Sequence, residues 1–263
     1  MSAPEVITAD NLTRRFGGLV AVEGYSLALR AGELVGLIGP NGAGKTTAFN
    51  LLTGVIRPTS GRIRIAGEDL TGRAPNALAR RGVARTFQNI RLFSDLSVLE
   101  NIMCGAHMRY GASIFPTLFK LPAFRRAERV IEQRAMEISE LTGLTHLMGR
   151  RAGDLSYGDQ RRVEIARALA SEPTALLLDE PAAGLNPSET ETLVGLIRGI
   201  NRQLGAAVMV VEHDMRLVMG LCQRVQVLNR GRLVADGTPA EVQNNPGVIE
   251  AYLGTRRNGG ANA

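Results

Sequence analysis

The stretch Gly39-Pro40-Asn41-Gly42-Ala43-Gly44-Lys45-Thr46-Thr47 follows the apolar run at residues 34–38 and matches the pattern G-x-x-x-x-G-K-[ST]. Its three glycines let backbone N–H groups turn inward around an anion, and a helix beginning at the end of the stretch would add the positive end of its dipole. Lys45 can reach the β- and γ-phosphates of a nucleotide, and the Thr46 hydroxyl can ligate Mg²⁺. A glycine-rich turn that only packs a strand on a helix is the alternative. With every fixed position present, the stretch predicts a phosphate site between a buried strand and a helix.

The composition is that of an ordinary globular chain. Its 263 residues suffice for one large α/β domain or for a body with an inserted subdomain. Only Lys45 and Lys120 are lysines among 31 basic residues, and the formal charge of +6 includes no block of five or six like charges. Cys104 and Cys222 lack metal-ligand spacing and are expected to be reduced thiols. Because we find neither a signal peptide nor a run of 18 apolar residues, we expect a cytoplasmic chain that could dock on a membrane protein.

A second apolar strand carries the carboxylates that a nucleotide site needs. Residues 175–178 are Ala-Leu-Leu-Leu, and Asp179 and Glu180 follow them. Ligand chemistry lies at the carboxyl ends of strands in parallel sheets, so Asp179 can hold Mg²⁺ and Glu180 can act as general base on the attacking water. A strand-end Asp-Glu that only solvates the next turn is the alternative. Asp179 lies 133 positions after Thr46 (179 − 46), which is more than one strand–helix unit requires.

The region between these strands divides the chain. Residues 1–88 contain short strands and the phosphate loop, which predicts a partly antiparallel sheet beside the nucleotide strand. From 89 to 155 the alternation stops and apolar residues in 126–141 recur at helical spacing, which predicts an inserted helical subdomain. The apolar side chains at 114–119 are expected to be exposed. The α/β pattern resumes over 156–240, and 241–263 are expected to form a short helix and a frayed tail.

Several motifs in a fixed order identify a family. The phosphate loop, the helical insert, the segment Leu155-Ser156-Tyr157-Gly158-Asp159-Gln160 and the Asp-Glu strand resemble the nucleotide-binding subunit of ABC transporters over nearly the whole chain. The resemblance implies an α/β P-loop NTPase fold with a mostly parallel core sheet, an N-terminal antiparallel β subdomain and an inserted α-helical subdomain. It also implies ATP and Mg²⁺ as ligands, and two subunits that sandwich two ATP molecules and hydrolyse them.

The resemblance assigns roles to single residues. Ser156 and Gly158 match the signature that contacts the γ-phosphate bound by the partner subunit, and Ser156 is also a good N-cap for a helix running to about residue 170. Gln88 matches a Mg²⁺-ligating glutamine, His213 matches the switch histidine that senses the γ-phosphate, and Phe16 matches the aromatic residue that stacks on adenine. The predicted catalytic residues are Lys45, Gln88, Glu180 and His213. The predicted ATP ligands are Phe16, Gly39, Pro40, Asn41, Gly42, Ala43, Gly44, Lys45, Thr46 and Thr47, with Ser156 and Gly158 acting on the partner's ATP. The predicted Mg²⁺ ligands are Thr46, Gln88 and Asp179.

Two positions depart from the family's commonest signature, L-S-G-G-Q. Tyr157 and Asp159 stand where that sequence has glycine and glutamine. An added carboxylate near a phosphate could weaken ATP-driven closure of the dimer, and the sequence leaves this effect open. The loop at residues 183–186 matches the one that crosses between subunits, and it ends on Asn186 where many members have aspartate.

Longer stretches resemble one branch of the family. They are Arg85-Thr86-Phe87-Gln88-Asn89-Ile90-Arg91-Leu92-Phe93, Glu180-Pro181-Ala182-Ala183-Gly184-Leu185-Asn186-Pro187, Glu212-His213-Asp214-Met215 and the ending at residues 244–254. These stretches are similar in sequence to the ATP-binding subunit of bacterial branched-chain amino-acid importers. Lipid-export ATPases share much of this sequence, so the ATPase of a lipid or lipopolysaccharide exporter is the alternative.

The resemblance also implies partners and excludes other classes. The expected partners are a second ATPase subunit (a second copy of this chain or a related subunit), permease subunits contacted through the helical subdomain, and a solute-binding protein, with the chain peripheral on the inner face of the cell membrane. A soluble ABC protein of ribosomes or DNA is disfavoured, because one cassette without a coiled-coil or zinc insert is present, so no nucleic acid is expected. A switch GTPase would need Asn-Lys-x-Asp, and neither lysine follows an asparagine.

Overall fold

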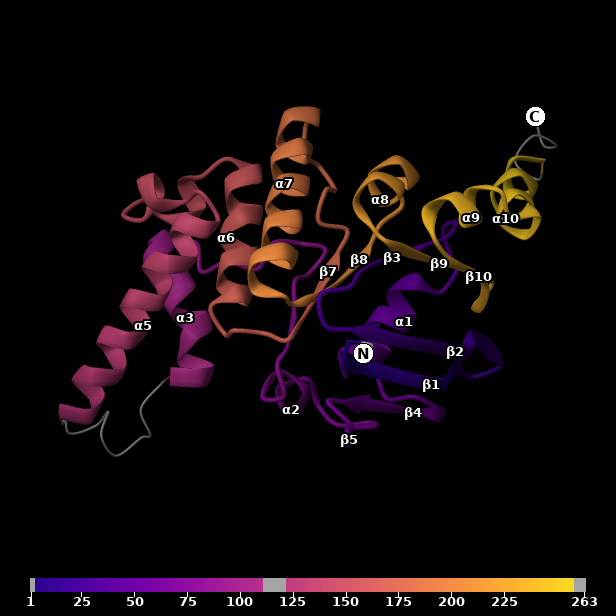
Figure 1. Cartoon of the computed structure of the whole chain (residues 1–263), viewed down its shortest axis with the longest axis horizontal. Helices are drawn as coiled ribbons and strands as arrows, with labels where there is room; N and C mark the ends of the chain where they lie inside the picture. Colours follow the sequence, from indigo (N-terminus) through magenta and orange to yellow (C-terminus); the bar gives the residue numbers. More distant parts are fainter. Residues whose placement is uncertain (1–2, 111–121, 258–263) are drawn as a thin grey trace.

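The computed structural model describes residues 3–110 and 122–257, and consists of two sheets and a group of helices (Figure 1). The core sheet has the strand order β10-β9-β3-β8-β7-β6. Its strands are β3 (Leu34–Ile38), β6 (Val83–Arg85), β7 (Ala175–Asp179), β8 (Ala207–Val211), β9 (Arg224–Asn229) and β10 (Arg232–Gly237). All neighbours pair in parallel except β9 and β10, which form an antiparallel hairpin. The mostly parallel core sheet expected from the sequence is confirmed.

The second sheet is antiparallel, with the order β2-β1-β4-β5. Its strands are β1 (Glu5–Phe16), β2 (Leu19–Arg30), β4 (Ser60–Ile65) and β5 (Glu68–Asp69). The prediction of short strands before the phosphate loop is wrong, because β1 and β2 run for 12 residues each and pair along their length. Shifts of register interrupt this pairing, for example where Asn11 takes a left-handed conformation with φ 51°. These irregularities hide the long strands from a search for strict alternation.

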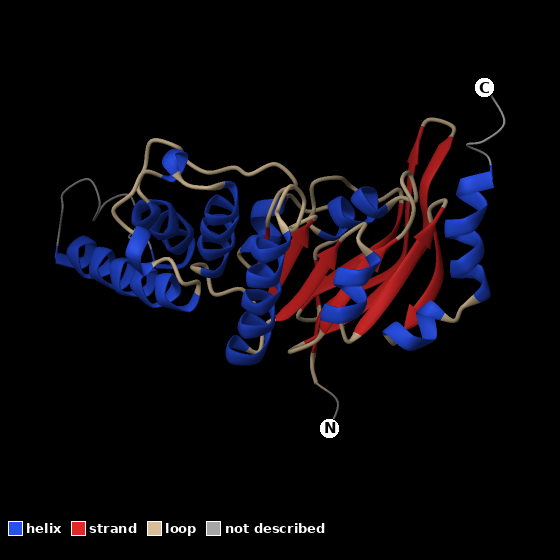
Figure 2. Cartoon of the chain, turned by 90° about the horizontal axis from the view of Figure 1, so that it is seen from above, coloured by secondary structure: helices blue, strands red, loops and turns tan. Residues whose placement is uncertain are grey.

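Helices cover the core sheet on both faces (Figure 2). They are α1 (Lys45–Leu52), α2 (Pro75–Ala79), α3 (Val98–Tyr110), α5 (Pro122–Leu141), α6 (Tyr157–Leu169), α7 (Pro187–Leu204), α8 (Met215–Leu221), α9 (Pro239–Gln243) and α10 (Pro246–Arg257). α3 and α5 form one end of the molecule, α9 and α10 lie at the other, and α6 packs on α3 and α5 (Figure 1). The inserted helices are thus confirmed, and α10 is longer than the predicted short helix. In the described residues no helix is both long and apolar enough to span a bilayer.

Two apolar cores explain why the buried strands carry almost no polar residue. All five residues of β3 are buried, and successive side chains point to opposite faces of the sheet. Leu34 and Ile38 join the core formed with α3, α5, α6 and α7, whereas Val35 and Leu37 join the core formed with α1 and the antiparallel sheet. Each central strand is therefore held from both sides. The predicted exposed segment 114–119 and the end of the predicted tail, 258–263, lie outside the described residues.

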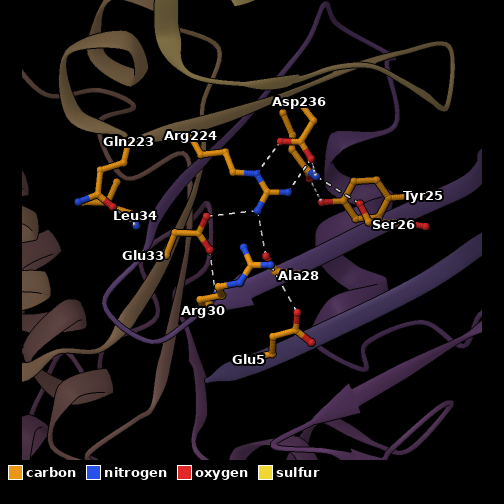
Figure 3. Close-up of polar contacts among 11 residues, drawn as sticks. Glu5, Tyr25, Ser26, Ala28, Arg30, Glu33, Leu34, Gln223, Arg224 and Asp236 are labelled. Atoms are coloured by element: carbon orange, nitrogen blue, oxygen red, sulfur yellow. Dashed lines mark hydrogen bonds and ion pairs between the residues drawn. The ribbon is translucent and has the colours of Figure 1, made fainter. Parts of the chain in front are cut away.

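A polar network fastens the two sheets together (Figure 3). Arg224 of β9 donates to both carboxylate oxygens of Asp236 at 2.6 Å and to Glu33 at 3.2 Å. The buried Tyr25 hydroxyl of β2 donates to Gln226 of β9 at 2.6 Å. Burial alone would raise the pKa of Asp236, but hydrogen bonds from Arg224 and Gln226 lower it below its ordinary value. The network fixes the antiparallel sheet beside the strand that leads into the phosphate loop.

Candidate nucleotide site

The phosphate loop connects β3 to α1, as the sequence predicts. Gly44 is the N-cap of α1 and has φ 101°, a conformation that side chains beyond glycine rarely adopt. A Cβ on Gly44 would lie 2.6 Å from the carbonyl oxygen of Ala21, and a Cβ on Gly39 would lie 2.1 Å from that of Leu228. The loop is thus wedged between the β1–β2 hairpin and β9. Asn41, Gly42 and Thr46 remain exposed at its outer surface, where a phosphate can reach their backbone and side-chain donors.

Lys45 lies inside the loop and not in solvent. Its side chain is buried, and Nζ donates to the carbonyl oxygens of Gly39 at 2.7 Å and Pro40 at 3.2 Å. Burial lowers the pKa of this ammonium group, while the nearby Glu180 carboxylate acts in the opposite direction. The ammonium thus already points along the loop, and only neutral acceptors compete with a phosphate for it.

Asp179 and Glu180 occupy the carboxyl end of β7, but their surroundings differ. Asp179 is 5 % exposed, and burial raises the pKa of its carboxyl group while the charge of Arg85 opposes the rise. Glu180 is a non-glycine residue with φ 44°, so the chain turns sharply directly after Asp179. This turn directs the Glu180 carboxylate to Gln88, whose Nε2 donates to Oε2 at 3.1 Å. Neighbouring carboxylates thus separate into a buried one and an accessible one.

His213 lies on the opposite side of Glu180 from the chain that leads to Gln88. Its Nδ1 is 3.9 Å from Oε2 of Glu180, and its ring is 59 % exposed. Its backbone N–H donates to Glu212, a carboxylate only 1 % exposed that also accepts the N–H of Ala182 at 2.9 Å. Burial raises the pKa of Glu212 despite these hydrogen bonds. Glu212 therefore ties the end of β8 to the turn that carries Glu180.

The residues predicted for one nucleotide fall into two groups. Lys45, Asp179, Glu180, Gln88 and His213 gather at the carboxyl ends of β3, β7 and β8, which are adjacent in the sheet. Ser156 and Gly158 instead begin α6, which packs on the outer strand β6 and on α3. Phe16 lies at the end of β1, 45 % exposed, with the Arg14 guanidinium 4.5 Å from its ring centre. Its exposed ring face is free to stack on a base.

The start of α6 has the N-cap that the sequence predicts. Ser156 is the N-cap and its hydroxyl accepts the N–H of Asp159 at 3.2 Å. The Asp159 carboxylate pairs with Arg162 and so does not complete a capping box. Tyr157 lies against Gly184, where a Cβ would be 3.2 Å from its ring. The extra carboxylate in the signature segment is therefore balanced by a neighbouring guanidinium group.

Oxygen ligands for a hard cation are available beside the loop. Thr46 offers an exposed hydroxyl, Asp179 a buried carboxylate and Gln88 an amide oxygen, which are ligand types that Mg²⁺ accepts when nucleotide phosphates complete its shell. A carboxylate buried without full compensation also favours a cation. Within the described residues no cluster of three or more His, Cys, Asp and Glu side chains forms a metal cage of its own. The residues thus fit a cation that arrives with a nucleotide.

Four charged residues near the site were not singled out by the sequence. They are Arg85, Arg161, Glu164 and Glu212. The Arg85 guanidinium donates to Thr53, the C-cap of α1, at 2.8 Å and lies between the rings of Phe49 and Phe87, 4.8 and 4.5 Å from their centres. Arg161 and Glu164 are fully buried in α6. One signal was present, since Arg161 falls on the helical stripe of Gly158, Ile165 and Leu169, where an apolar residue would be expected.

Two protein-family profiles match the sequence. The profile described as ABC transporter matches residues 22–183, and the profile described as branched-chain amino acid ATP-binding cassette transporter matches residues 232–257. The first match includes the phosphate loop, α6 and Glu180. The second falls on β10, α9 and α10, outside the nucleotide site.

Curated relatives are similar over nearly their whole length. The high-affinity branched-chain amino acid transport ATP-binding protein BraF of Pseudomonas aeruginosa is 48% identical over 254 residues, which are 97% of this chain and 99% of that protein. LivG of Salmonella typhimurium, described in the same words, is 49% identical over the same shares. The lipopolysaccharide export system ATP-binding protein LptB of Escherichia coli is 38% identical and covers 94% of this chain and 97% of its own.

Solved structures agree with the fold. An ATP-binding cassette of an ABC transporter in its ADP conformation superposes with a TM-score of 0.82 at 31% identity, covering 95% of this chain and 99% of that one. A dimeric cassette in a post-hydrolysis state with ADP and phosphate superposes with a TM-score of 0.74 at 26% identity, covering 89% and 98%.

Proposed function

We propose that this chain, which belongs to the ABC transporter family of ATP-binding proteins, hydrolyses ATP to power a membrane importer of branched-chain amino acids. The observation that carries the proposal is the position of Glu180. Its carboxylate reaches Gln88 at 3.1 Å and lies close to Lys45 and His213, at the end of the strand beside the phosphate loop. This arrangement serves the attack of water on a γ-phosphate.

The chain's own residues divide the work of hydrolysis. Lys45 exchanges the neutral carbonyl oxygens of Gly39 and Pro40 for negatively charged phosphate oxygens, so an ion pair replaces two hydrogen bonds to neutral acceptors. Thr46, Asp179 and Gln88 would supply oxygens to a Mg²⁺ ion, which would neutralise charge on the phosphates. Glu180 accepts a proton from the attacking water.

His213 completes the hydrolytic site from the next strand. Its ring is exposed, while its backbone N–H donates to Glu212. The ring can therefore turn toward a γ-phosphate without loss of its anchor. Loss of the phosphate would release the ring, which makes His213 the group that reports hydrolysis.

A second subunit completes the site. Ser156 caps α6, whose 13 residues give its N-terminus the dipole and the free N–H groups that bind anions. α6 packs on the edge strand β6 and on α3, whereas the phosphate loop leads from β3 into α1. We assign the N-terminus of α6 to the ATP of a partner subunit. The dimeric form of a related cassette with ADP and phosphate supports this arrangement.

A groove between the core and the helical group is the proposed contact with the permease. It has a volume of about 600 Å³ and is lined mainly by apolar atoms, with Phe87, Phe93, Cys104 and Gly105 among its residues. Phe93 is 54% exposed, which is unusual for a large apolar side chain. The groove takes in the segment that leads to Gln88. We assign the groove to a short helix of a permease subunit, because a movement of that helix would be transmitted to the hydrolytic site through the segment that leads to Gln88.

The choice of substrate rests on two comparisons that agree. Relatives named for branched-chain amino acid transport are 48–49% identical to this chain, whereas the lipopolysaccharide export relative is 38% identical. The profile at residues 232–257 is named for branched-chain amino acid transporters. Export of lipopolysaccharide is therefore the second candidate, and its support is the less similar of these relatives. The complete importer would include permease subunits at the inner face of the membrane and a solute-binding protein.

Uptake by cells tests the proposal. A strain lacking this gene should lose high-affinity uptake of radiolabelled leucine, and the wild-type gene should restore it. Lys45→Ala should fail because ATP binding is lost, and Glu180→Gln should fail while the purified variant accumulates as an ATP-bound dimer. Normal leucine uptake in the deletion strain, together with defective lipopolysaccharide delivery, would instead support the exporter. Normal hydrolysis by purified Glu180→Gln would refute the mechanism.

A further inference from the structure

The helix α6 buries a charged pair in the interior of the protein. The side chain of Arg161 is 0% exposed and that of Glu164 is 2% exposed, and Nη1 of Arg161 is 2.7 Å from Oε2 of Glu164. Taking two charges out of water is costly, and a well-packed apolar pair is often at least as stable at such a position. A buried pair of this kind therefore calls for a role beyond stability.

The pair grips the backbone of the segment that carries Gln88. Arg161 donates through Nη1 to the carbonyl oxygen of Phe87 and through Nη2 to that of Gln88, both at 2.8 Å. Glu164 accepts the N–H of Phe87 at 3.3 Å. The two charged groups thus hold three backbone polar groups of one short stretch. We call Arg161 and Glu164 the α6 clamp.

The clamp begins where the β-ladder ends. Thr86 still donates its N–H to Leu177 of β7 at 3.0 Å, and its hydroxyl accepts the N–H of Asp179. From Phe87 on, the chain leaves the sheet and runs without regular structure to residue 93. The α6 clamp is what fixes the first two residues of this departure. Because Gln88 itself is exposed, side-chain packing does not fix it.

The position of Gln88 matters because its side chain reaches Glu180. Nε2 of Gln88 lies 3.1 Å from Oε2 of Glu180. A displacement of the Gln88 backbone by one or two ångströms would break this hydrogen bond. Control over the backbone at 87–88 is therefore control over a contact to the general base.

We propose that Arg161 and Glu164 are positioning residues that hold Gln88 on Glu180 and make this contact follow the movement of α6. The inference rests on the proposed function, in which Ser156 at the start of α6 meets the partner's ATP. Ser156 precedes Arg161 by five residues, about 7.5 Å along one rigid helix. Contact with the partner's nucleotide at Ser156 is thereby transmitted to the hydrolytic site of the same chain.

The test is a double-mutant cycle on ATP hydrolysis by the purified full chain. Arg161→Lys keeps the charge but removes the fork that reaches two carbonyl groups. The double variant Arg161→Met/Glu164→Leu removes the clamp and leaves no unpaired charge, which guards against loss of folding. We expect Gln88→Ala and the clamp-free double variant each to lower kcat about 10-fold, with KM for ATP within about 2-fold. Combining them should still lower kcat only about 10-fold, because both changes remove one contact.

A structural control and a second readout separate positioning from mere stability. Arg224→Met removes another largely buried arginine that lies in the network between the two sheets and outside the nucleotide site. It should lower Tm without changing the coupling to Gln88. Amide exchange of the segment 87–93 in nucleotide-free protein should become faster in the clamp-free variant and stay unchanged in Arg224→Met.

Several results would overturn the inference. One is a 100-fold loss in the combined variant, which would mean that the clamp and Gln88 act independently. Another is a clamp-free variant with wild-type kcat and slow exchange at 87–93. An unchanged kcat in Gln88→Ala would also overturn it, since nothing would then act through Gln88. The proposed function would fail separately if the wild-type chain hydrolysed no ATP. In that case, faster amide exchange at residues 87–93 in the clamp-free variant than in the wild type would still show that Arg161 and Glu164 hold this segment.

Discussion

Gly105 provides a sharp test of how the helical group is packed. It lies inside α3 with an ordinary helical backbone, so alanine is conformationally acceptable there. A Cβ on Gly105 would nevertheless lie 1.9 Å from the carbonyl oxygen of Arg167 in α6 and 2.9 Å from its carbonyl carbon. The obstacle is backbone, which cannot rotate away as a side chain can. Gly105→Ala should therefore force α3 and α6 apart.

The size of the effect follows from two opposing terms. Alanine is favoured over glycine in a helix interior by about 0.8–1 kcal/mol. Against this, the two helices must separate by roughly 1–1.5 Å to restore an ordinary carbon–oxygen contact of about 3.3 Å. Overpacking of this kind costs typically 1–3 kcal/mol, and this clash belongs at the upper end. We expect Gly105→Ala to be less stable by about 1–2 kcal/mol, which lowers Tm by about 3–6 °C for a chain of this size.

Gly195 is the matched control. It lies in the interior of α7, is exposed, and a Cβ there would meet nothing within 4 Å. Gly195→Ala should therefore stabilise the protein by about 0.5–1 kcal/mol. Thermal and urea unfolding of both variants would measure the two signs side by side. If Gly105→Ala raised Tm as Gly195→Ala does, α3 and α6 would not approach as closely as described. Because Gly105 also lines the groove between core and helices, binding of the proposed permease partner should weaken in Gly105→Ala only.

Three further predictions concern charge. Asp179→Asn should raise Tm of the nucleotide-free protein by about 2–4 °C at pH 7. Burial raises the pKa of this carboxyl group, so the folded state disfavours its charged form. The gain in Tm should vanish below about pH 4, where the aspartate is neutral in both the folded and the unfolded state. Arg224→Met should cost about 2 kcal/mol in urea unfolding at pH 7, because it removes the guanidinium partner of Asp236, whose side chain is 26% exposed and keeps the hydrogen bond from Gln226. Since the pKa of Asp236 is lowered in the folded protein, its contribution is present above the unfolded pKa near 3.9 and is lost as the pH falls below it, so the difference from wild type should shrink there. Asp159→Asn should tighten ATP-driven dimerisation about 3-fold in sedimentation at low salt, because it frees Arg162 at an anion-binding helix terminus; a weaker dimer would contradict this.

The parts of the fold that were predictable depend on local sequence. The buried strands β3, β7 and β8 are continuous apolar runs, and the loop after β3 has a spacing that admits one geometry. Asn186 and Glu189 form a capping box at the start of α7, a signal that can be found in the sequence because N-cap chemistry involves only four consecutive residues. Gly205 ends the same helix in a left-handed conformation, which is the common role of a glycine just after a helix. Each of these signals is complete within a short stretch.

The parts that were not predictable depend on contacts between distant residues. Arg161 and Glu164 belong to a helix whose sequence allows its charges to face solvent, and only packing against residues 87–88 makes them buried. The length of β1 and β2 depends on pairing through irregular register, which leaves no strict alternation to count. Ser156 and the phosphate loop could be assigned to different subunits only through the resemblance, because spacing along the chain does not show which groups meet. That assignment stays a prediction, and the structure adds that α6 packs on the edge strand β6 and on α3.

Glu180 shows how a strained turn and a buried charge support each other at the site. A left-handed backbone costs a non-glycine residue about 1–2 kcal/mol, so the turn after Asp179 must be held by its surroundings. Two hydrogen bonds link the turn to β8 and to the residue that follows it: the N–H of Glu180 donates to Val211 of β8 at 2.9 Å, and the N–H of Ala182 donates to the buried Glu212. Burial raises the pKa of Glu212, so its carboxylate is itself kept at a cost. The left-handed backbone of Glu180 and the buried carboxylate of Glu212 both cost stability, and together they fix the direction of the Glu180 carboxylate. Glu212→Gln should therefore release the turn and lower ATP hydrolysis without weakening ATP binding, since Lys45 and the phosphate loop do not depend on it.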